Sequence, residues 1–191
     1  KNEEHASCWI SVAMGWAGKG WGQFFLPRIG QEVVVSFLEG DPDRPLITGS
    51  VYNAEQTVPY ELPGEQTKST IKSNVHKGGG GYNELRFEDQ KDEEEVYFQA
   101  QRDYHQVVKN DARVEIGLET KDKGDLTVEI QNARSVAVNE GDDLLEVKKG
   151  KRTVNVEMDN ELTVAKGKRA VTVKTGNDEL TVSKGDQKTT V

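Results

Sequence analysis

The chain has 191 residues, of which 34% are hydrophobic and 30% charged, with a net charge of -8 and a mean hydropathy of -0.72. This composition is more polar than that of most soluble domains, so a well-filled core in a single copy is not expected. No apolar stretch is long enough to span a membrane, and no secretory signal pattern is present, so synthesis in the cytoplasm is expected. The acidic balance argues against nucleic acid as a partner, and the single cysteine, Cys8, excludes a disulfide within one chain.

The first segment has the composition of a small globular domain. All five prolines and all three tryptophans lie within the first 63 residues. Strands are predicted at 8–13, 31–38 and 45–52, with a polar turn at 39–44, because apolar and β-branched runs are bounded there by Gly, Pro and Asp. We predict a small all-β domain at residues 1–55 and a linker at 56–66.

Residues 65–104 form a transition in which apolar and polar residues alternate. The segments 83–89 and 95–100 both alternate, and the polar run 90–94 between them predicts a hairpin loop. Leu85, Phe87, Val96 and Phe98 are expected to share one buried face of this hairpin, since alternate residues of a strand point to the same side.

The 87 residues after Tyr104 contain no aromatic residue, proline or cysteine, yet they repeat. Segments 144–160, 161–178 and 179–191 align with a period of 17 to 18 residues, and apolar pairs recur every nine residues. Gly150, Gly167 and Gly185 lie between pairs. Disorder would not produce this periodicity, so each unit predicts a short strand and a turn. Residues 67–191 are predicted to be a needle of strand–turn repeats, each of eight or nine residues.

One copy of these repeats cannot bury its own apolar surface. Two aliphatic side chains per unit supply roughly 3–6 kcal/mol when buried, whereas ordering nine residues costs about 9–18 kcal/mol of backbone entropy. Wrapping of several identical chains around one axis would cover every apolar face and pair every strand edge. The residues predicted to form the interior of this assembly are Leu126, Val128, Val136, Val138, Val147, Val154, Val156, Leu162, Val164, Val171, Val173, Leu180 and Val182.

Two segments carry a specific resemblance to a known family. CWISVAMGWAGKGWGQFFLPRIGQEVVVSFLEGDPDRPLITGSVYN (8–53) and GGGGYNELRFEDQKDEEEVYFQAQRD (78–103) closely resemble VgrG, the spike protein of the bacterial type VI secretion system, which is related to the central spike of contractile-tail phages. The resemblance implies an all-β fold: a partial OB-fold-type β-barrel followed by a trimeric, intertwined, triple-stranded β-helix. It also implies that a large hub precedes Lys1 in the whole protein and that the needle tip lies beyond Val191.

The resemblance further implies a structural role without catalysis and without a cofactor. Such a spike caps a tube of Hcp-type hexameric rings through its N-terminal hub, and carries a PAAR-type tip protein or effectors at its C-terminal end. It is held in the bacterial cytoplasm before firing, then driven through the target cell envelope into the extracellular space or the target cell. Three alternatives stay open: a phage or pyocin-type spike, a spike with a catalytic domain outside residues 1–191, and a single-chain β-solenoid that binds carbohydrate.

Glycine-rich and histidine-containing segments have structural explanations. Segments 15–20 and 78–81 lack the spacing of a phosphate-binding loop, so both are expected to be loops and no nucleotide site is predicted. The histidines His5, His76 and His105 lack metal-ligand spacing, so no metal site is predicted.

The acidic run and the tryptophans also have structural explanations. The acidic run 92–95 is expected to be a solvated turn rather than a pair of catalytic carboxylates, because nothing apolar surrounds it. Trp9, Trp16 and Trp21 are assigned to the barrel core or to a trimer contact, in preference to a carbohydrate-stacking platform.

Overall fold

The structure is a computed structural model that describes residues 9–118 and 124–189. The chain divides into two compact units, Lys1–Val114 and Glu115–Val191, and each is described by itself. Within the described ranges every regular element is a β-strand or a short 3-10 helix of one turn, which agrees with the predicted all-β class.

The first sheet has the strand order β1-β5-β4. Strand β1 is Ser11–Val12, β4 is Glu32–Phe37 and β5 is Pro45–Val51. β1 pairs with β5 in parallel and β4 pairs with β5 antiparallel, with a register shift between Val34 and Val35. Two of the predicted strands, 31–38 and 45–52, are confirmed nearly residue for residue. The strand predicted at 8–13 is shorter, and its first residue, Cys8, lies outside the described residues.

The connection between β4 and β5 is the polar turn predicted at 39–44. It begins with the 3-10 turn η2 (Leu38–Gly40), and the Asp41 carboxylate accepts a hydrogen bond of 3.0 Å from the Asp43 amide. Gly40 has a φ of 75°, a backbone angle that glycine adopts without steric cost. Ile47 on β5 is the buried apolar side chain of the described part of this unit, at 8% exposure, so the core of a single copy is very small.

A glycine-rich hairpin lies between β1 and β4 in the sequence. Strands β2 (Ala17–Gly18) and β3 (Trp21–Gly22) pair antiparallel across a two-residue turn in which Gly20 has a φ of 81°. The sequence analysis expected only a loop at 15–20. The expected loop at 78–81 begins at Gly78, the last residue of the 3-10 turn η3 (His76–Gly78).

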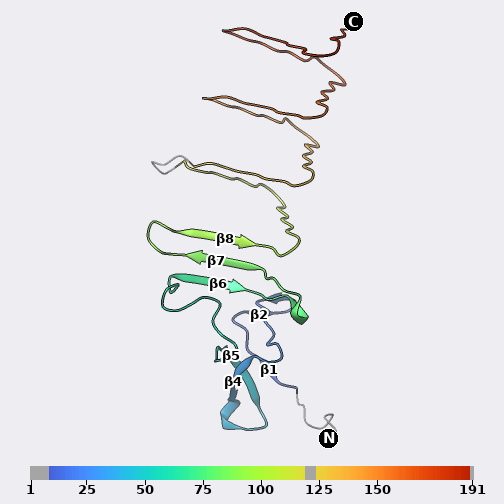
Figure 1. The fold of residues 1–191 in the computed structure, drawn as a ribbon. Helices are drawn as coiled ribbons and strands as arrows, with labels where there is room; N and C mark the ends of the chain where they lie inside the picture. The colour runs from blue at the N-terminus through green and yellow to red at the C-terminus, as the bar shows by residue number, and fades with distance from the viewer. Residues whose placement is uncertain (1–8, 119–123, 190–191) are drawn as a thin grey trace. The chain divides into compact units, whose positions relative to one another are not determined.

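The second sheet has the order β6-β7-β8 and is antiparallel throughout (Figure 1). Its strands are β6 (Lys68–Lys72), β7 (Glu84–Glu88) and β8 (Glu95–Gln99). The predicted hairpin is therefore confirmed. Leu85 lies opposite Phe98, and Phe87 opposite Val96, so the four side chains share one face as predicted, although that face is largely exposed in one copy.

The repeats contain no strand pairing among the described residues 105–118 and 124–189. In Figure 1 the chain after β8 continues as extended segments linked by turns. From residue 131 onward, bends begin every eight or nine residues, at 131, 139, 148, 157, 165, 174 and 183. Gly150 and Gly167 occupy two of these bends with φ of 114° and 103°. The strand–turn period is thus present in the backbone, while the extended segments have no strand partner among the described residues.

Candidate functional site

The dominant surface of the repeats is a set of uncovered aliphatic side chains. In Leu162-Thr163-Val164 the two apolar side chains are 68% and 46% exposed, and the same pattern recurs in every described unit. All thirteen predicted interior residues are 46–70% exposed in one copy: Leu126, Val128, Val136, Val138, Val147, Val154, Val156, Leu162, Val164, Val171, Val173, Leu180 and Val182. Their place in a trimer interior stays a prediction.

The total surface area shows how far one copy is from a self-sufficient fold. A compact monomer of 21.2 kDa would expose roughly 9,000 Å², whereas this chain exposes 19980 Å². Exposed apolar surface of this extent is a feature of interfaces rather than of monomers. The functional surface of this chain is therefore one that other protein copies can cover.

The polar face of the β6-β7-β8 sheet carries a hydrogen-bonded cluster within one copy, although Glu84 Oε2 and Arg86 Nε are buried there without a hydrogen-bond partner. Glu84 on β7 is 3% exposed and accepts hydrogen bonds from the Tyr60 hydroxyl and, at 2.8 Å, from Thr70 Oγ1. The Lys72 ammonium lies 3.8 Å from Glu84 Oε2 and 4.1 Å from the centre of the Tyr82 ring. These contacts attach the segment that carries Tyr60 to the face of the sheet.

Burial and hydrogen bonding act in opposite directions on Glu84. Burial raises the pKa of the carboxyl group, but the hydrogen bonds from Tyr60 and Thr70 and the charges of Lys72 and Arg86 outweigh it, so the pKa lies below its ordinary value. Glu84 is therefore ionised at neutral pH.

Arg86 extends this polar cluster along β7. Its guanidinium donates to Tyr60 and pairs with Glu95 at 2.6 Å, and it lies 4.5 Å from the centre of the Tyr97 ring. The hydrogen bonds with Tyr60 and Glu95 raise the pKa of Arg86. No sequence motif predicted this cluster, because Tyr60 and Glu84 are 24 residues apart, and the alternation at 83–89 predicts a strand but not the partner of Glu84.

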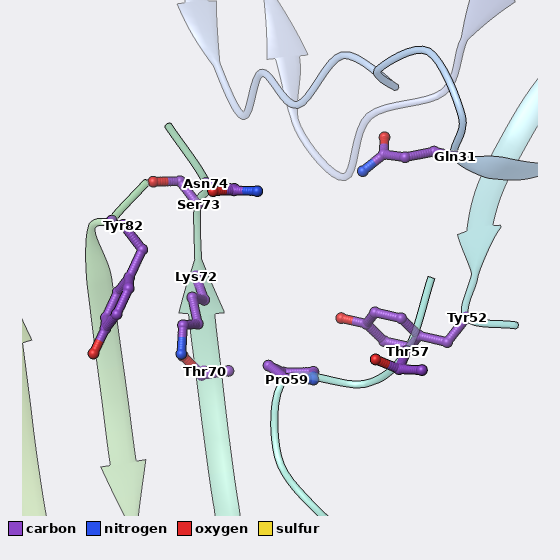
Figure 2. A pocket seen from close by; sticks show the side chains of 10 residues that line it. Gln31, Tyr52, Thr57, Pro59, Thr70, Lys72, Ser73, Asn74 and Tyr82 are labelled. Carbon is purple, nitrogen blue, oxygen red and sulfur yellow. The ribbon is translucent and has the colours of Figure 1, made fainter. Parts of the chain in front are cut away.

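A cavity of about 460 Å³ lies beside the cluster. Figure 2 shows Thr70 and Lys72 of β6 on one side of it, with Tyr52 and Thr57 on the facing side. Lys72 is the one charged residue among those that line it, and its ammonium is already engaged by Glu84 and Tyr82. The residues that line the cavity include no carboxylate, histidine or cysteine.

The other candidate residues do not come together. His76 and His105 are exposed, and His5 lies outside the described residues. No group of three His, Cys, Asp or Glu residues that could hold a metal occurs in the described ranges. Residues 92–94 of the acidic run lie in the β7–β8 connection as predicted, whereas Glu95 begins β8 and pairs with Arg86.

The tryptophans are not in a core. Trp16 and Trp21 meet edge to face with ring centres 4.9 Å apart, but they are 63% and 57% exposed, and Trp9 is fully exposed. Their assignment to a core within one chain is therefore wrong, because the small first sheet has no second layer to cover them. A trimer contact for these residues stays a prediction.

Within the described residues, no helix is long and apolar enough to cross a membrane. The fold and the uncovered surface thus define a class of protein: an all-β chain whose repeats need other copies to complete their pairing.

Comparison with known sequences identifies the family. Residues 69–190 match the family described as the bacteriophage T4 gp5 C-terminal trimerisation domain, and residues 1–52 match the type VI secretion system/phage-baseplate injector OB domain. The chain belongs to the gp5 C-terminal trimerisation domain family, since that match covers more than half of its length. The OB-type domain, the trimeric class and the relation to phage spikes are thereby confirmed.

Similar proteins carry names that agree with the resemblance to VgrG. The type VI secretion system spike proteins VgrG1a and VgrG4b of Pseudomonas aeruginosa are 57% identical over 61% of this chain and 50% identical over 64% of it, respectively. The actin cross-linking toxin VgrG1 of Vibrio cholerae is 45% identical over 70% of the chain. The chain spans 18%, 15% and 12% of these relatives, less than a fifth of each.

Proposed function

We propose that this chain is the OB-domain and needle portion of a type VI secretion spike, acting as a homotrimer. The observation that carries the proposal is the uncovered aliphatic repeat surface within a chain that matches a trimerisation domain over residues 69–190. Three wrapped copies would leave no open strand edge, which gives a stiff and soluble shaft. The domain boundaries 1–55, 56–66 and 67–191 are part of this proposal.

The role is mechanical rather than catalytic. Force passes along the shared aliphatic interior, and the spike punctures the envelope of a target cell. The polar cluster around Glu84 supports this assignment, because its ionised groups are engaged with one another rather than aimed at an open site. The assignment concerns residues 1–191; the relative named a toxin is matched over 12% of its length.

The partners follow from the same assignment. The spike caps a tube of Hcp-type rings through a hub outside this chain, and carries a PAAR-type tip protein or effectors at its C-terminal end. It is cytoplasmic before firing and reaches the extracellular space or the target cell afterwards. No nucleic acid takes part, which agrees with the net charge of -8.

The test is a chimera of Pseudomonas aeruginosa VgrG1a in which the matched segment is replaced by that of this chain. In cells that lack their own VgrG1a and depend on it for firing, we expect secretion of the tube protein into the medium. The purified chain should sediment at about three times 21.2 kDa. A folded monomer, or a stable trimeric chimera that supports no secretion, would contradict the proposal.

A further inference from the structure

The turns of the repeats alternate in charge. Here a turn is the stretch between two successive aliphatic pairs, and its net charge is the number of Lys and Arg minus the number of Asp and Glu. From residue 131 onward, successive turns have net charges of opposite sign. The net charges are +1 for 131–135, -3 for 139–143, +4 for 148–152, -3 for 157–161, +3 for 166–169, -1 for 174–179 and +1 for 184–188. The aliphatic pairs recur every nine residues, whereas the charge pattern recurs only after two units.

Turns of opposite charge form no ion pair with each other within the described residues 124–189. Across the described residues 124–189, one ion pair is present, between Lys148 and Glu146 at 3.8 Å, and it joins a turn to its own extended segment. Basic and acidic turns of one chain are separated by a whole extended segment. Any compensation between turns of opposite sign must come from another copy.

Threefold wrapping determines which turns meet. The extended segments have no partner among the described residues of their own unit, so their partners belong to the other two copies. Symmetry places the same unit of all three copies at the same height but on different faces. The strand stacked next on any face, about 4.8 Å away, is therefore the preceding or following unit of a neighbouring copy. A basic turn of one copy then lies between acidic turns of its neighbours.

We propose that this alternation fixes the register of the three chains. The inference rests on the trimer of the proposed function and adds to it. The aliphatic pairs repeat every nine residues, so burial alone is nearly the same after a slip of one unit. The same slip would bring turns of like charge together, such as 148–152 against 166–169. A slip of two units restores the charge pattern but leaves two units unpaired at each end. The charges therefore disfavour the one slip that the aliphatic pattern permits.

Cysteine cross-linking tests the register. Thr163 and Thr172 are exposed, uncharged and central in successive extended segments, so they fall side by side on neighbouring copies in the proposed register. In a Cys8→Ser background, Thr163→Cys with Thr172→Cys should give a covalent trimer on oxidation, because stacked strands bring the two Cα atoms within disulfide range. Thr172→Cys alone should give no cross-link, since its three copies lie on three faces. A cross-linked dimer from the single variant would overturn the register.

Charge reversal tests whether the turn charges fix the register. Lys166→Glu with Lys168→Glu and Arg169→Glu places three acidic turns in succession, and the corresponding glutamine variant removes attraction without adding repulsion. At low ionic strength the glutamate variant should melt about 5 °C or more below the glutamine variant. In about 1 M salt the two variants should melt at the same temperature, because the screening length falls to about 3 Å. With Thr172→Cys added, the glutamate variant should also gain cross-linked dimers through slippage.

The outcomes separate this inference from the proposed function. Equal melting of the two variants at low ionic strength, with both still trimeric, would overturn the charge mechanism and leave the spike intact. A mass of one chain for the unmodified protein would overturn the spike itself. Reversing Lys19, Lys77 and Lys91, which lie outside the charged turns 131–188, changes the net charge equally and should not lower the melting temperature as the glutamate variant of 166–169 does.

Discussion

A charge placed on the aliphatic face should prevent assembly, and Val171→Asp is the most direct test. Val171 is 60% exposed in one copy, so covering the rest of it is worth roughly 1–2 kcal/mol per copy and 3–6 kcal/mol per trimer. An unpaired buried carboxylate costs several more kcal/mol in each copy. Together these losses approach the whole stability of an ordinary domain, about 5–15 kcal/mol.

The assay is sedimentation velocity combined with thermal melting. Val171→Asp should lose the trimer mass at micromolar concentrations or melt far below the unmodified chain. Thr172→Asp is the matched control: it adds the same charge one residue away on the opposite side of the segment, and should stay trimeric with a nearly unchanged Tm. Equal mass and equal Tm for the two variants would refute the assignment of Val171 to an interior.

Further predictions concern the polar cluster and the turns. Tyr60→Phe removes the hydroxyl that donates to the ionised Glu84, and should lower the free energy of unfolding by about 1.5–3 kcal/mol in chemical denaturation; an unchanged midpoint would show that the contact contributes nothing. Because folding lowers the pKa of Glu84 below 4.5, its stabilising contribution is complete above that pH and is lost as the pH falls through the lower, folded-state value. Glu84→Gln should therefore flatten the acid limb of a Tm-against-pH series, and an identical limb would contradict this. Gly167→Ala should cost about 1–3 kcal/mol per copy by forcing a side chain into a φ of 103°, whereas Gly64→Ala, at an ordinary φ with open space around it, should change Tm little.

Local patterns in the sequence were enough to predict part of the fold. The alternation at 83–89 and 95–100 predicted β7 and β8, and apolar runs bounded by Gly and Pro predicted β4 and β5. These signals succeed because one strand displays its periodicity without reference to its partner. The nine-residue repeat predicted the spacing of the bends for the same reason.

Elements that depend on distant partners were missed. Strand β6 has a single large apolar residue, Ile71, and is a strand because β7 pairs with it along its whole length. The cluster of Tyr60 with Glu84 depends on a chain reversal that no local pattern encodes. The tryptophans were predicted to lie in the barrel core or at a trimer contact, but Trp9, Trp16 and Trp21 are all exposed in one copy.

After the β6-β7-β8 sheet, the chain passes from strands that pair within one copy to repeats that have no strand partner among the described residues of that copy. β7 pairs with both β6 and β8 within one copy and a polar cluster covers one face of the sheet, while the other face exposes Phe87, Val96 and Phe98. After Gln99, the described residues have no strand partner in the same copy. The sheet can therefore form before association, since its contacts are local, whereas the repeats gain nothing from order until three copies meet. Folding of the repeats and trimer formation are, on this argument, a single step.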